Sequence, residues 1–145
     1  MQNIQSSADR VDAIEDLIQV FRNAIINKHA ESFLALFHDG PVPWLGVYND
    51  ATIAAGKMLN ADHTKIWPDT HHEFINRIVQ HPADIEEKFW NIRVHSQGDI
   101  ASVHFDYSFH MDERKNNWGE EAWQLVRSEQ GWRISAVAYS ICCVD

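Results

Sequence analysis

The sequence predicts an α+β fold in which helices precede a long antiparallel β-meander. From residue 86 to residue 141, apolar and polar residues alternate with the two-residue period of half-buried strands, and short polar turns interrupt the pattern. Before residue 86, apolar residues mostly recur at helical spacing. Helices followed by a run of strands are typical of α+β proteins, and 145 residues fit a single domain spanning 1–145.

Two helices are expected in the first part of the chain. An apolar stripe over residues 11–25 predicts a helix that is capped by Ser7 or Asp9 and ends near residue 27. A shorter helix is expected over residues 30–37, where Asp39-Gly40-Pro41 stops it.

The middle of the chain mixes a short strand with further helices. Residues 42–48 are typical of a strand, and Pro43 restricts it to a sheet edge or to the start of the strand. A third helix is expected over residues 50–60, followed by a loop over 65–69. Asp69 or Thr70 then caps a helix that runs through residue 79.

Four strands are expected in the meander, at residues 88–95, 101–111, 117–128 and 132–141. The second has the strictest alternation, with Ala101, Val103, Phe105, Tyr107, Phe109 and Met111 on one face. Gly98 fits the first turn because glycine accepts positive φ, and residues 112–117 are expected to form a polar loop.

Composition excludes several classes of protein. The net charge of −9 and the absence of a basic run argue against a nucleic-acid surface. No stretch has the roughly 20 apolar residues of a membrane helix, and no signal peptide is visible. The two cysteines, Cys142 and Cys143, are adjacent and cannot easily bridge each other, so we expect a reducing, cytoplasmic location.

The chain resembles a known superfamily in the order of its elements. A short helix ending in LFHDGPVPWLGVY and paired strands ending in GEEAWQLVRSEQGWRISAVAYS are similar to the nuclear transport factor 2 (NTF2)-like superfamily, in its SnoaL-like, polyketide cyclase-like branch. The resemblance covers residues 11–141 and is most specific in the last hairpin. It implies a curved, cone-shaped antiparallel sheet with N-terminal helices on its concave face, a domain core over about 9–141, and frequently a homodimer.

The same resemblance leaves the activity open. Members include ketosteroid isomerases, scytalone dehydratases, epoxide hydrolases, polyketide cyclases and non-catalytic binding or assembly domains, so the fold does not fix the function. Many relatives carry a histidine two and four residues before the closing serine of the last strand. This chain has Ala138 and Ala136 there, which removes one common catalytic imidazole.

Strand pairing estimated from the turns places a candidate catalytic carboxyl in a cavity. Pairing Phe105 with Gln124 and Phe109 with Glu120 puts Glu120 on the face that the helices cover. A carboxyl in an aromatic cavity is suited to general acid–base chemistry because burial raises its pKa. The alternative is that Glu120 lies at a solvated strand end and has no role in a cavity. The residues expected to line the cavity are Trp44, Tyr48, Tyr107, Gln124 and Tyr139.

The opposite face of the same pairing mixes apolar and polar residues, which is typical of a dimer interface. Its expected members include Arg93, Trp123 and Ile134. His104 and Asp106 form either part of this interface or, if a bulge turns them inward, a catalytic dyad.

Two further groups of residues are candidates for a site. Asp39, with His38 beside it, either stops a helix or acts as the base that some relatives carry in this region. The nine histidines lack metal-ligand spacing, and no cofactor-binding motif is present, so we expect neither a metal nor a cofactor.

Two classes of function therefore remain. One is a small-molecule-binding protein, with or without cofactor-independent lyase or isomerase activity on a small apolar substrate. The other is a non-catalytic homodimeric interaction module. An open cavity of several hundred Å³ with convergent polar groups favours the first, whereas a cone filled by its own side chains favours the second.

Overall fold

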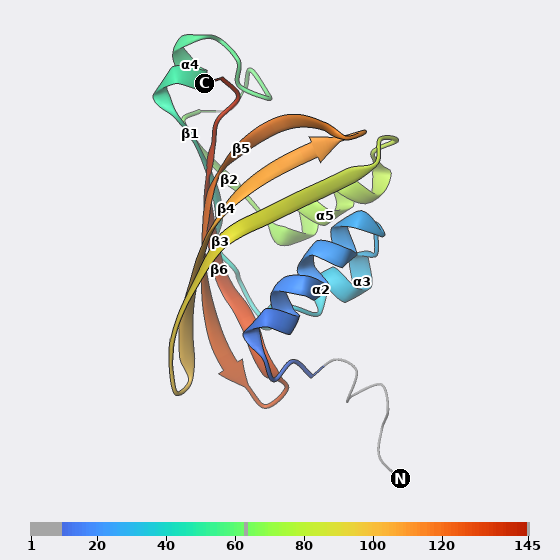
Figure 1. The fold of residues 1–145 in the computed structure, drawn as a ribbon, viewed down its shortest axis with the longest axis vertical. Helices are drawn as coiled ribbons and strands as arrows, with labels where there is room; N and C mark the ends of the chain where they lie inside the picture. Colours follow the sequence, from blue (N-terminus) through green and yellow to red (C-terminus); the bar gives the residue numbers. More distant parts are fainter. Residues whose placement is uncertain (1–9, 63, 145) are drawn as a thin grey trace.

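The computed structural model describes residues 10–62 and 64–144, and its six-stranded sheet carries helices on its concave side (Figure 1). The strand order is β2-β1-β6-β5-β4-β3, so β2 and β3 are the free edges and the sheet is open. β1 runs parallel to β6, and every other neighbouring pair is antiparallel. The α+β fold with helices on the concave face is confirmed, although the sheet is mixed rather than wholly antiparallel.

Within the described residues, four helices precede the meander: α2 (Ile14–Ile26), α3 (Ala30–Leu34), α4 (Asp50–Ala54) and α5 (His71–Gln80). Aromatic rings join the helices to the sheet. The ring of Phe21 in α2 lies 4.6 Å from that of Trp123 in the sheet and 4.9 Å from Phe33 in α3, and Phe74 of α5 lies 5.7 Å from Phe33. The cap expected at Thr70 is present, because its hydroxyl accepts a hydrogen bond from the Glu73 amide over 3.0 Å.

The early part of the chain corrects several expected boundaries. The caps expected at Ser7 and Asp9 lie outside the described residues, and α2 begins only at Ile14. The third helix is shorter than expected, and the loop expected over 65–69 contains β2 (Ile66–Asp69). β1 (Trp44–Tyr48) begins just after Pro43, so the proline takes no place inside the ladder and β1 lies between two other strands.

The register between β4 (Ile100–Met111) and β5 (Arg114–Ser128) differs from the expected one by three residues. Phe105 pairs with Glu121 instead of Gln124, because the expected polar loop is a two-residue turn and β5 already starts at Arg114. An odd shift moves every β5 side chain to the other face of the sheet. Trp123 and Leu125 therefore point into the core, where they are 0% and 1% exposed.

A bulge changes the face of β3 (Ile85–Gln97). The register shifts between Trp90 and Arg93, where Asn91 has a φ of 55°. Before the bulge Phe89 packs on Phe105 at 4.2 Å, so Glu87 also points inward, whereas Trp90 is 48% exposed on the outer face. The register also shifts between Gln124 and Leu125, where Ser135 is the extra residue in β6 (Gly131–Ile141).

None of the helices within residues 10–62 and 64–144 is both long and apolar enough to cross a membrane. Cys142 and Cys143 are free thiols.

The turn between β4 and β5 holds the register in place. Asp112 and Glu113 have φ values of 49° and 69°, which is the left-handed conformation of both central residues in a type I′ turn. Asp112 is anchored twice on the segment before β3: its amide donates to the Asp84 carbonyl oxygen over 2.8 Å, and its Oδ1 accepts from the Asp84 amide over 2.9 Å.

Replacing Glu113 with glycine should therefore raise the free energy of unfolding by about 1 kcal/mol, because glycine adopts positive φ without the clash of a side chain. Urea denaturation of Glu113→Gly against the unaltered protein measures this. Glu129→Gly is the control, since Glu129 lies in another hairpin turn at ordinary φ. Equal effects of the two substitutions would contradict the strain at Glu113.

Candidate functional site

A cavity of about 580 Å³ lies between α5 and the concave face of the sheet. Such a volume is within the range of small-molecule sites. Six aromatic side chains contribute to its wall: Trp44, Trp67, Phe74, Tyr107, Phe109 and Tyr139. The cone is therefore not filled by its own side chains.

Two buried glutamates face this cavity. Glu87 of β3 is 3% exposed and Glu121 of β5 is 5% exposed. Glu87 pairs with Phe109 across the ladder and Glu121 pairs with Phe105, so the two carboxyl groups approach the same central strand from opposite sides. The two carboxyl groups are close enough to interact directly, and a hydrogen bond between them requires that one carries a proton.

Burial acts on both carboxyl groups but not equally. Burial raises the pKa of Glu87 well above its ordinary value, and the adjacent Glu121 adds to this effect. Burial also raises the pKa of Glu121, but the hydrogen bonds from Glu87 and from Trp123 oppose that rise. Both pKa values are raised, and the rise is opposed by hydrogen bonds only at Glu121, so Glu87 is the carboxyl that holds its proton more strongly.

The donors around the pair explain this asymmetry. The indole Nε1–H of Trp123 donates to Glu121 Oε1 over 3.0 Å. Glu87 Oε2, by contrast, has no hydrogen-bond partner among the described residues although it is buried. A hydrogen-bonded carboxylate keeps its charge more easily than one without donors, which agrees with the stronger rise of the pKa at Glu87.

Tyr107 is fixed between the two glutamates. Its hydroxyl donates to the Ser140 carbonyl oxygen, 2.8 Å away, and Asn117 Oδ1 lies 2.9 Å from it. This anchor depends on Gly119, because a Cβ there would lie 2.4 Å from the Ser140 oxygen. Burial raises the pKa of Tyr107 well above its ordinary value, so its hydroxyl stays protonated and serves as a rigid wall.

α5 brings a cation to the cavity, but that cation is already paired. Arg77 forms an ion pair with Asp69, whose side chain is 6% exposed, and its guanidinium lies 5.2 Å from the centre of the Trp67 ring. His81, just after α5, also lines the cavity, and its Nδ1 accepts from the Ala83 amide over 3.0 Å. Within residues 10–62 and 64–144, no group of three potential ligands is placed to hold a metal ion.

The expected cavity residues separate into two groups. Trp44, Tyr107 and Tyr139 line the cavity. Tyr48 is fully buried elsewhere in the core and is absent from the wall. Gln124 is exposed on the outer face, where its Oε1 accepts from Ser102 over 3.2 Å, because the β5 register turns it outward.

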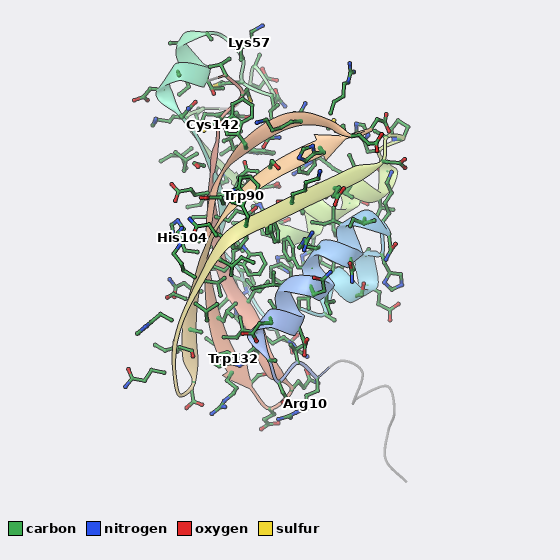
Figure 2. All side chains as sticks on the ribbon, in the orientation of Figure 1. Arg10, Lys57, Trp90, His104, Trp132 and Cys142 are labelled. Atoms are coloured by element: carbon green, nitrogen blue, oxygen red, sulfur yellow. The ribbon has the colours of Figure 1, made fainter. Side chains whose placement is uncertain are left out.

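The expected catalytic residues lie on the outer face as well. Glu120 does not face the cavity: its side chain is 60% exposed, and its Oε1 lies 2.8 Å from His104 Nε2. Figure 2 shows His104 on the side of the sheet away from the helices. Asp106 pairs with Trp90 and Glu120 on that same face, and no bulge turns the His104 and Asp106 pair inward.

The expected dimer face needs a similar correction. Arg93 is on the outer face, 4.0 Å from Glu120, whereas Trp123 and Ile134 are both 0% exposed in the core beneath the helices. Asp39 is exposed after α3 and lines no part of the cavity, and His38 contacts the Pro41 carbonyl oxygen at 3.3 Å.

Glu87 and Glu121 were missed by reasoning from the sequence, although a signal for each was present. Ile85, Glu87 and Phe89 alternate with polar residues, and Glu121 shares its spacing with Trp123 and Leu125. In both cases a carboxyl occupies a position of an otherwise apolar face.

Comparison with known structures places this architecture in a class. An open curved sheet with helices and a cavity on its concave side defines the chain as an α+β protein with the fold of the NTF2-like proteins. A candidate dehydratase of the NTF2-like family from Streptomyces avermitilis matches with a TM-score of 0.62 at 12% identity, over 88% of this chain and 92% of that one. An NTF2-like protein from Cytophaga hutchinsonii matches with a TM-score of 0.63 at 14% identity, over 97% and 99%.

A third similar structure is a candidate aromatic ring hydroxylase from Novosphingobium aromaticivorans, with a TM-score of 0.61 at 14% identity, over 97% of this chain and 92% of that one. No protein-family model and no curated protein matches the chain. These similarities establish the fold and specify no branch, so the SnoaL-like assignment stays a prediction.

Glu87→Gln should flatten the pH dependence of stability. Folded Glu87 keeps its proton above 4.5, the ordinary pKa at which the unfolded chain loses it, so the folded state binds more protons and the free energy of unfolding falls as the pH rises. Glutamine does not titrate, so this fall should shrink. Urea denaturation at pH values from 4.5 upward measures it. Glu120→Gln, on the exposed neighbour, is the control and should keep the fall. A Glu87→Gln curve parallel to that of the unaltered protein would contradict the raised pKa.

Proposed function

We propose that the cavity binds a small, largely apolar molecule and that Glu87 and Glu121 perform cofactor-independent acid–base chemistry on it, as a lyase or an isomerase. The observation that carries this proposal is the pair of adjacent buried carboxyl groups with raised pKa values that faces an aromatic cavity. Titratable groups with pKa values pushed apart by their surroundings are typical of acid–base sites.

The pair supplies a base and an acid to the same substrate. In a dehydration, the Glu121 carboxylate takes a proton from a carbon next to a carbonyl group, and neutral Glu87 gives its proton to the leaving hydroxyl, which departs as water. The electrons of the C–H bond form the new double bond. The pair then holds one proton as before, but on Glu121, and the hydrogen bond between the two carboxyls lets the proton return to Glu87.

The aromatic wall supports a flat or polycyclic substrate. The rings of Trp44 and Phe74 are 4.8 Å apart and those of Trp44 and Tyr139 are 6.2 Å apart, so they offer packing surface on one side of the cavity. One structure with this fold is described as a candidate dehydratase, which agrees with the chemistry. The SnoaL-like branch and a cytoplasmic location are part of this proposal.

A thermal-shift screen of polyketide-, steroid- and terpenoid-like compounds tests binding, because a ligand of the folded state alone raises the melting temperature. Compounds that bind are then assayed for loss of water or movement of a double bond. Glu121→Gln and Glu87→Gln should each lower kcat about 10²- to 10⁴-fold, the usual contribution of a general acid or base. Glu120→Gln is the matched control, since its side chain is exposed on the outer face.

An unchanged kcat in both cavity variants would overturn the catalytic part of the proposal and leave a binding protein. If no compound gives a saturable shift of the melting temperature, the result would favour the alternative, a non-catalytic interaction module.

We also propose that the chain forms a homodimer through the outer face of the sheet. Leu45 and Trp90 are 37% and 48% exposed there. Ala122 and Ala138 lie between them in neighbouring strands and keep the centre of the face flat. The pair of His104 with Glu120 lies beside Ala122 and adds polar groups to the same face, and interfaces commonly combine apolar and polar contacts.

Ala138→Arg should convert the dimer to a monomer, because it places a charge at the centre of this face. Analytical ultracentrifugation measures the mass. Gln19→Arg, on the exposed side of α2, adds the same charge and should leave the dimer intact. A dimer that survives Ala138→Arg, or a monomeric unaltered protein, would contradict this interface.

A further inference from the structure

We propose that Trp123 is a positioning residue that holds Glu121 ionised and thereby returns the shared proton to Glu87 after each turnover. This inference deepens the proposed function and uses the same carboxyl pair. It concerns how two chemically identical side chains keep different roles when a direct hydrogen bond lets the proton move between them.

The geometry makes the pair unequal through one donor. Trp123 Nε1–H donates to Glu121 Oε1 over 3.0 Å, and both side chains are buried. Glu87 Oε2, by contrast, is buried without a hydrogen-bond partner among the described residues. A donor stabilises a carboxylate more than a neutral carboxyl group, so the state with charge on Glu121 is lower in free energy than the state with charge on Glu87.

The indole cannot easily follow the proton if it moves. Trp123 is two residues from Glu121 on the same face of β5, and it is 0% exposed. Its ring is held by those of Phe21, Phe105 and Phe89, at 4.6, 5.1 and 6.2 Å. Packing therefore fixes the N–H in place, and it keeps pointing at Glu121 in every protonation state of the pair.

The other titratable groups that line the cavity do not select Glu121 in this way. Tyr107 donates to Ser140, and Arg77 of α5 is paired with Asp69. Tyr139 of β6 stays protonated because burial raises its pKa, and the Nδ1 of His81, after α5, accepts from a backbone amide. Among the described residues, the Trp123 indole is the side chain that distinguishes the two carboxyls by a direct hydrogen bond.

The role matters because the proposed reaction leaves the pair inverted, with the proton on Glu121 and the charge on Glu87. In that state the Trp123 N–H faces a neutral carboxyl and its charge-assisted hydrogen bond is lost. Transfer of the proton through the hydrogen bond between the carboxyls restores it. The indole thus provides the free-energy difference that resets the acid and the base.

The test is a carbon-13 NMR titration of protein labelled at the glutamate side-chain carboxyl carbons, without any ligand. In the unaltered protein the lower of the two titration steps of the pair should move the Glu121 resonance, and the upper step that of Glu87. Resonances are assigned with Glu87→Gln and Glu121→Gln. Because the two groups are coupled, each step belongs to the pair, and the relative movement of the two resonances reports where the proton lies.

Trp123→Phe removes the N–H and keeps an aromatic ring in the core. The lower step should then rise by about one pH unit, a tenfold loss of acidity, since a hydrogen bond to a charged group is worth at least that much. Both resonances should also move together, because the proton is no longer confined to Glu87. Trp132→Phe is the control: Trp132 is equally a core tryptophan, 7% exposed, and lines no part of the cavity.

A second measurement covers the case in which Trp123→Phe does not fold. The nitrogen-15 resonance of the Trp123 indole in the unaltered protein should shift across the lower step. In the Glu87→Gln protein this resonance should stay close to its position in the unaltered protein, whereas in Glu121→Gln it should move far from that position.

An indole resonance that does not move, or a Trp123→Phe protein with the titration of the unaltered one, would overturn the inference. Neither result depends on a substrate, so this inference can fail while turnover is found, and it can hold while no ligand is found.

Discussion

The pairing of β4 with β5 decides which side chains of the longest strand reach the cavity, and the rest of the site depends on it. The two-residue turn at Asp112 and Glu113 sets this pairing, and its anchor on Asp84 ties it to the strand that carries Glu87. A shift by one residue would expose Trp123, break the aromatic contact between sheet and helix, and turn Glu121 into solvent. Core and site are therefore specified by the same constraint.

The site is held together by the surroundings of the carboxyl pair more than by the pair itself. Burying two carboxyl groups away from water costs stability, and a protein retains them only where neighbouring packing stabilises the fold. Here Phe21, Phe89 and Phe105 close around Trp123 next to Glu121. The aromatic cluster that joins α2 to the sheet also excludes water from one side of the pair, which is why the carboxyl pKa values are raised.

Much of the fold could be predicted because local sequence patterns determine its helices and strands. The strict alternation of β4 identifies its inner face, and Thr70 caps α5 through a local hydrogen bond. The site depended instead on features with no local pattern. The turn at Asp112 lacks glycine, the bulge at Asn91 has no preceding signal, and β2 contains a proline. Each changes pairing by tertiary contacts, which a single sequence does not reveal.

Glu120 and Glu121 show that residue identity alone does not decide whether a carboxyl group is buried or exposed. The two are neighbours in the sequence, have the same side chain, and occupy the same strand. One is bound to His104 on an exposed face, and the other is bound to Trp123 and Glu87 in a buried cavity. Because successive side chains of a strand point to opposite faces of the sheet, the two glutamates differ only in the face that each occupies. The large apolar residues of β5, Trp123 and Leu125, lie on the same face as Glu121, so packing volume identifies the buried carboxyl where charge does not.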